Sequence, residues 1–156
     1  MLEPSPSNHW QTDHATLLLN CYRHWTGHDL IEPSPSPHAA AHTLYEAPFV
    51  VLSHNTEADP CFTYANLAAQ RLFEMPWSEI VGLPSRYSAE PLVREERERL
   101  LRRVAGHGFI DDYSGVRIAK SGRRFRIEHA TVWNLIAADG SPAGQAAAFS
   151  HWHALG

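Results

Sequence analysis

The stretch from Ala47 to Leu83 constrains the fold most, because its patterning changes from strand to helix within a few residues. Two short apolar runs, Phe49–Leu52 and Cys61–Tyr64, flank a polar segment, which is the pattern of two strands joined by a turn. After Asn66 the apolar residues recur at spacings of three and four, which predicts a helix. A second short helical segment is expected over Trp77–Gly82. Strand, turn, strand and short helices together predict a small α+β domain.

Three further strands are expected toward the C-terminus, over Ser114–Lys120, Arg123–Ile136 and Ala143–Trp152. Gly122 lies between the first two and Gly140 between the last two, and glycine is typical of tight turns between antiparallel strands. With the two early strands, these segments predict a five-stranded antiparallel sheet.

The strand Arg123–Ile136 is expected to place alternate side chains on opposite faces of the sheet. Strict alternation puts six residues on one largely apolar face: Phe125, Ile127, His129, Thr131, Trp133 and Leu135. We expect this face to be covered by helices.

Two longer helices are predicted outside the strands. The first runs from Asn8, with Gln11 completing a capping box, to Gly27, and it is amphipathic. The second begins near Pro91 and ends near His107. Residues 1–7 are expected to fray, and the proline-rich segment 32–37 is expected to be a linker.

Four segments carry a resemblance to a known family: FVVLSHNTEADPCFTYAN, PSRYSAEP, GFIDDYSGVRIAKSGRRFRIEHATVWNL and GQAAAF. Together they resemble the bacterial, stand-alone members of the MEKHLA family, which is PAS-like, over roughly Leu17 to Trp152. The resemblance implies a PAS-like five-stranded antiparallel sheet with helices on one face, plus the N-terminal amphipathic helix. It divides the chain into a helix and linker over residues 1–37 and a PAS-like domain over 38–156.

Composition limits the partners and the compartment. The 156 residues suit one domain, and 44% of them are hydrophobic, enough for a buried core. The formal net charge is −4, so we expect no nucleic-acid partner. No apolar run approaches the ~20 residues that a bilayer requires, so we expect no membrane partner. Cys21 and Cys61 form no disulfide framework, which favours a cytoplasmic protein with reduced thiols.

Motifs for catalysis, metal or a resident cofactor are not evident in the sequence. No G-x-S-x-G, H-E-x-x-H or glycine-rich phosphate loop occurs, and we expect neither catalytic residues nor a metal. Flavin photochemistry in PAS-like proteins requires a cysteine in an Asn-Cys-Arg-Phe motif on a helix, whereas Cys61 lies in a predicted strand. Haem would need a histidine on the long helix, where His107 is better explained as an end cap. The cofactor therefore stays unknown, with flavin adducts and haem not expected.

PAS-like folds hold small molecules between the sheet and its helices, so the resemblance implies a pocket for a small, apolar ligand. We expect that pocket to be mostly apolar with a few polar groups. Its predicted lining residues are Tyr64, Asn66, Phe73, Trp77, Tyr87, Phe125, Ile127, His129, Trp133 and Gln145. The same residues would also suit an ordinary core of this fold.

Three functional hypotheses remain. The first is a sensory module that binds a small molecule and interacts with proteins, without an output domain of its own. The second is a small enzyme that uses the sheet pocket, with His129 as general acid or base and Tyr64 as a polarising donor. The third is a ligand-free homodimer formed through the N-terminal helix and the sheet.

Overall fold

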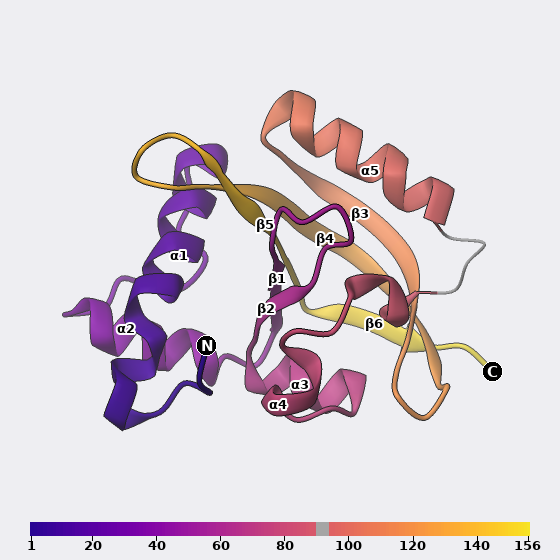
Figure 1. Ribbon diagram of the computed structural model, residues 1–156, viewed down its shortest axis with the longest axis horizontal. Coiled ribbons are helices and arrows are strands. Elements are labelled where there is room, and N and C mark those ends of the chain that lie inside the picture. The colour runs from indigo at the N-terminus through magenta and orange to yellow at the C-terminus, as the bar shows by residue number, and fades with distance from the viewer. Residues whose placement is uncertain (90–93) are drawn as a thin grey trace.

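A computed structural model describes residues 1–89 and 94–156 (Figure 1). Its helices are η1 (Pro6–Gln11), α1 (Thr12–Thr26), α2 (Pro37–Tyr45), α3 (Leu67–Phe73), α4 (Trp77–Ile80), η2 (Ser85–Ser88) and α5 (Arg94–His107). Its strands are β1 (Val50–His54), β2 (Phe62–Ala65), β3 (Phe109–Ile118), β4 (Arg124–Ile136), β5 (Pro142–Phe149) and β6 (His151–Ala154). The predicted start of the long helix at Pro91 lies outside the described residues.

The strands form one antiparallel sheet, as predicted, and their order is β2-β1-β5-β4-β3. The predicted last strand is divided in two, because pairing changes at Ser150: β5 pairs with β1 and β4, and β6 pairs only with the first part of β4. The sheet therefore has six strands rather than five.

Helices cover both faces of this sheet, so it separates two hydrophobic layers. The inner face packs against α3 and α5, and Phe73 and Leu100 belong to these inner clusters. The outer face packs against α1 and α2, whose Leu18 and Leu44 are completely buried. Figure 1 shows α1 and α2 together on one side of the sheet and α5 on the other. The N-terminal helix thus folds back onto its own domain.

A β-bulge in β4 divides that strand between the two layers. Tyr113 is opposite Ala130 and Gly115 is opposite Ile127, so β4 has one more residue than β3 between these pairs. His129, in the bulge, has a positive φ of 52°. The predicted single face is therefore wrong, because the alternation reverses at the bulge. Phe125 and Ile127 face the inner layer, His129 is exposed, and Trp133 and Leu135 face the outer layer.

The N-terminal residues are more ordered than the sequence suggested. The helix predicted from Asn8 begins at Thr12, since residues 9–11 all have positive φ. Asn8 accepts hydrogen bonds at Oδ1 from the backbone N–H groups of Ser5 and Gln11. Residues 1–7, which were expected to fray, contact the domain: Trp77 Nε1 donates to the Met1 carbonyl at 3.1 Å. The predicted end of α1 at Gly27 is confirmed.

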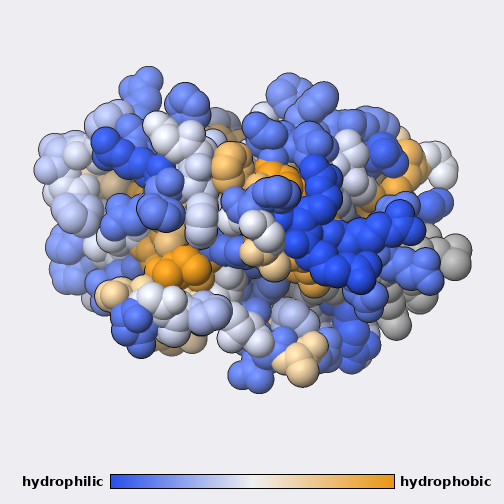
Figure 2. All heavy atoms as spheres, turned by 90° about the horizontal axis from the view of Figure 1, so that it is seen from above, coloured by the Kyte–Doolittle hydropathy of each residue, from blue (hydrophilic) through white to orange (hydrophobic). Residues whose placement is uncertain are grey.

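Helix α2 was not predicted, because the preceding prolines indicated a linker. The Ser36 side chain caps the helix by accepting a hydrogen bond from the Ala39 N–H. Pro37 occupies the first helical turn, where a backbone N–H has no partner within the helix, so the N–H that proline lacks is not needed. Helix α5 exposes its charged side, and the corresponding surface is mainly hydrophilic from above (Figure 2). No helix among the described residues is long and apolar enough to cross a membrane.

Candidate functional site

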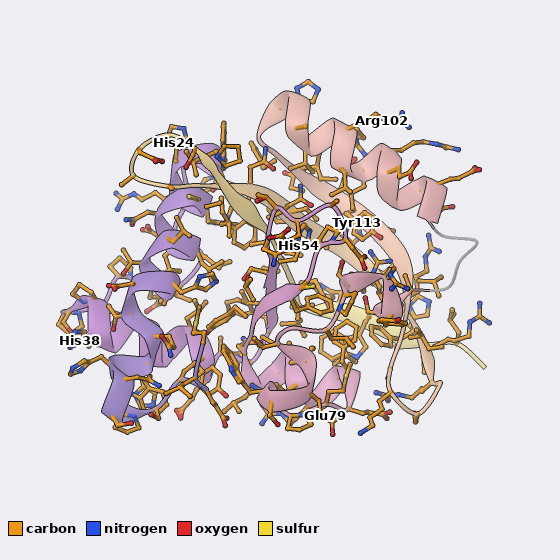
Figure 3. All side chains as sticks on the ribbon, viewed as in Figure 1. His24, His38, His54, Glu79, Arg102 and Tyr113 are labelled. Atoms are coloured by element: carbon orange, nitrogen blue, oxygen red, sulfur yellow. The ribbon has the colours of Figure 1, made fainter. Side chains whose placement is uncertain are left out.

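A cavity of about 90 Å³ lies on the inner face of the sheet, bounded by β1, β2, β3, β4, β5, α3, η2 and α5. His54 and Tyr113, both labelled in Figure 3, are among its walls. Its apolar lining consists of Leu52, Phe62, Phe73, Ala89, Leu100, Leu101, Ile127, Ala130, Val132, Ala146, Ala147 and Phe149. Its polar lining consists of Ser53, His54, Ser85, Ser88, Tyr113, Arg117 and Gln145.

The cavity has the construction of a small-molecule site, with apolar walls and a minority of polar groups. Two of those groups lie on different strands: Gln145 on the central strand β5 and Arg117 on the edge strand β3. Ser88 Oγ donates to the Ser85 carbonyl at 2.7 Å, which stabilises η2 at the rim. The arrangement can hold a mostly apolar molecule by burial and orient it by hydrogen bonds.

Three of the ten predicted pocket residues line this cavity: Phe73, Ile127 and Gln145. Phe125 lies beside them in the core and contacts Phe73 edge to face, with ring centroids 5.3 Å apart. These four residues lie on the inner side of the sheet, and their contact with a ligand stays a prediction.

Three predicted pocket aromatics belong instead to the outer layer, beneath α1 and α2: Tyr64, Trp77 and Trp133. The Tyr64 and Trp77 rings are 5.6 Å apart, and Trp133 Nε1 donates to the Leu18 carbonyl at 3.2 Å. The Tyr64 hydroxyl is buried without a hydrogen-bond partner among the described residues, and burial raises the pKa of Tyr64. They are packing residues between the N-terminal helices and the sheet.

The remaining predicted residues have other positions. Asn66 caps α3, and its amide makes four hydrogen bonds: Oδ1 accepts from the Val51 and Ala69 N–H groups, and Nδ2 donates to the Leu44 and Phe49 carbonyls. All of its bonding capacity is used inside the protein.

Tyr87 and His129 are exposed. The guanidinium of Arg86 lies over the Tyr87 ring, 4.4 Å from its centroid, and Tyr87 is 57% exposed, so it cannot form a cavity wall. His129 lines a shallow depression of the outer face with Leu30 and Thr131. Tyr64 is not part of that depression, so the structure gives no support to His129 and Tyr64 as a catalytic pair.

Asn134 connects the cavity wall to the two long helices. Its Nδ2 donates to the Val104 carbonyl of α5 at 3.1 Å, and its Oδ1 accepts from Gln145 Nε2 at 3.3 Å. Its backbone carbonyl accepts from Trp25 Nε1 of α1 at 2.9 Å. A change at Gln145 therefore has a short, hydrogen-bonded route to α1.

Several residues that line the cavity were not predicted from the sequence, notably His54, Ser85, Tyr113 and Arg117. His54 could have been found, since it continues the alternation of Val50 and Leu52 in β1. Tyr113 could not, because β3 begins earlier than predicted and its register against β4 shifts between Ile110 and Tyr113. Arg117 follows Tyr113 on the same side of β3.

The cysteines do not fit a flavin adduct. Cys21 Sγ lies in α1 on the outer layer, where it accepts from the Ile136 N–H, and Cys61 Sγ points to the Asp59 carbonyl. Neither cysteine lines the cavity, and His107 at the exposed end of α5 does not line it either. Among the described residues no group of three or more His, Cys, Asp or Glu side chains could hold a metal ion.

Comparison with known proteins gives one family and one fold. The model of the MEKHLA domain matches residues 12–154. A PAS domain of a protein from Colwellia psychrerythraea has a TM-score of 0.61 at 12% identity and covers 75% of this chain and 94% of its own. The light-state dimer of the fungal blue-light photoreceptor Vivid has a TM-score of 0.56 at 13% identity, covering 87% of this chain and 90% of that one. No curated protein matches.

Proposed function

Since this chain belongs to the MEKHLA domain family, we propose that it is a PAS-like sensory module that binds a small, mostly apolar molecule in the inner cavity. The proposal depends on the cavity under α5, whose lining is mostly apolar and includes a few polar groups. Phe73, Ile127 and Gln145 would contact the ligand directly. Reduced Cys21 and Cys61 support the further proposal of a cytoplasmic location.

The signal would pass from the cavity to the N-terminal helix. A ligand that contacts Gln145 or displaces α5 would change the hydrogen bonds of Asn134, which also holds Trp25 of α1. We propose that residues 1–37 are the responsive part and residues 38–156 the binding part. A ligand shifts such an equilibrium only by the difference between its affinities for the two states.

Native mass spectrometry of the purified chain tests the binding function. We expect a retained small molecule, and we expect Ala147→Leu to abolish its retention by filling the cavity. Ala138→Leu, in the exposed turn between β4 and β5, is the matched control and should retain it. Unliganded mass for the wild type, together with no binding from a library of small apolar compounds, would refute the proposal.

Hydrogen exchange tests the signalling route. Ligand should change exchange in α1 of the wild type, whereas Asn134→Ala should still bind but leave α1 unresponsive, because it removes the side-chain bonds to Val104 and Gln145. An unchanged α1 response in Asn134→Ala would exclude Asn134 as the connection.

A second proposal is a homodimer formed through the free part of the outer sheet face. Helix α1 covers Trp133 and Leu135, while the depression lined by Leu30, His129 and Thr131 lies beyond it. We expect Thr131→Glu, in this depression, to convert a dimer into a monomer in light scattering, with Ala138→Glu unchanged as the charge-matched control. A monomeric wild type would contradict the dimer without affecting ligand binding.

A further inference from the structure

The inner side of edge strand β3 presents a tyrosine and an arginine to the cavity. Tyr113, Gly115 and Arg117 occupy alternate positions, and both side chains line the cavity. Gly115 is buried, and a Cβ at this position would lie 2.1 Å from the Tyr113 hydroxyl oxygen. The phenol therefore lies over Gly115, toward Arg117, in space that a larger residue would occupy. Figure 3 shows Tyr113 below α5, and the side chain is half-buried.

The charge of Arg117 is not balanced by a neighbouring carboxylate of the described residues. Its guanidinium lies 5.5 Å from the Tyr113 ring centroid, and Nη1 donates to the adjacent Val116 carbonyl at 2.9 Å. Arg126, one strand away, instead forms an ion pair with Glu128 at 3.2 Å. A half-buried guanidinium has five donors, and most of those of Arg117 remain available to an anion.

We propose that the ligand of this cavity is a small carboxylic acid with an apolar body, an inference that rests on the proposed binding function. The carboxylate would accept from Arg117 and from the Tyr113 hydroxyl, and the body would lie against Phe73, Ile127 and Phe149. Guanidinium matches a carboxylate with two parallel hydrogen bonds, and such charge-assisted bonds are stronger than neutral ones. Amines of the same shape would be repelled by Arg117.

Two probes of equal chain length separate the acid from the apolar body: hexanoate and hexan-1-ol, titrated at neutral pH by ligand-observed NMR. We expect hexanoate to bind the wild type at least about tenfold more tightly than hexan-1-ol. Arg117→Gln should remove this preference and leave hexan-1-ol binding unchanged, which also shows that the variant is folded. Tyr113→Phe should reduce it by a smaller factor. Arg126→Gln is the control and should bind both probes like the wild type.

The outcomes distinguish the preference for a carboxylic acid from the binding function of the cavity. Equal hexanoate affinity in the wild type and Arg117→Gln, or binding of hexan-1-ol alone, would overturn the acid while leaving the apolar cavity as a binding site. Binding of neither probe would overturn the acid and count against the binding function itself.

Discussion

His14 is a titratable side chain enclosed between α1 and the sheet. Its Nε2 is 2.9 Å from Ser53 Oγ, which in turn contacts Thr63 Oγ1 at 2.8 Å, and the His14 and Tyr64 rings are 5.6 Å apart. Burial lowers the pKa of His14 from 6.5 to about 4, because the charged form would lose its hydration. The folded protein therefore keeps this imidazole neutral at pH values where the unfolded chain protonates it.

The first prediction concerns acid stability. Between pH 6.5 and about 4 the unfolded state binds the His14 proton first, so the free energy of unfolding falls as the pH falls, by up to ~3 kcal/mol. Above pH 6.5 the group has no effect. Urea unfolding at pH 7 and pH 4.5 should show a smaller loss for His14→Gln, which keeps a hydrogen-bonding group but cannot take up a proton. Parallel losses in wild type and variant would show that other groups cause the acid sensitivity.

At the scale of elements, the contact between α1 and the α5–β3 junction is unusually close. A Cβ at Gly108 would lie 2.2 Å from Trp25 Cε3, and Gly108 has a positive φ of 84°. Only glycine satisfies both conditions at this point. Trp25 can therefore approach the backbone and donate to Asn134.

The second prediction uses this contact. Gly108→Ala should lower the free energy of unfolding by about 1–3 kcal/mol, because it strains the backbone and displaces the Trp25 ring. Gly106→Ala is the control: a Cβ there meets nothing within 4 Å, and alanine favours a helix, so no loss is expected. Urea unfolding followed by tryptophan fluorescence compares them. Equal stability of the two variants would show that the Trp25 contact contributes little.

Local patterns predicted most elements but not the faces of the later strands. The strand pair at Val50 and Phe62 and the cap of α3 at Asn66 follow from alternation and turn chemistry. The bulge at His129 is set by how β4 pairs with β3, which no local pattern contains. Because the bulge was not predicted, Trp133 was assigned to the pocket, whereas it lies in the outer layer. Phe73, Ile127 and Gln145 were found because they lie where alternation and helical spacing still hold.

At the scale of the whole molecule, the N-terminal segment completes the outer hydrophobic layer. Val51, Tyr64 and Trp133 are fully buried, and they share one cluster with Ala15 and Leu18 of α1. The sheet depends on α1 and α2 for this cover, since the other helices lie mainly on the inner face.

The third prediction is that a chain lacking residues 1–37 will expose this layer, bind a hydrophobic dye such as ANS and lose cooperative unfolding. A shorter truncation, lacking residues 1–5, keeps α1 and removes only contacts such as the one from Trp77 to Met1, so it should behave much more like the full chain. A cooperative, dye-free protein after the longer deletion would show that the sheet needs no such cover.

The extra residue at His129 reverses the direction of the side chains that follow it in β4. One strand therefore contributes Ile127 to the inner layer under α5 and Trp133 to the outer layer under α1. Single-residue insertions or deletions in this strand should therefore exchange the linings of the two compartments, whereas paired changes should preserve them. In related chains we expect insertions or deletions in this part of β4 to comprise an even number of residues.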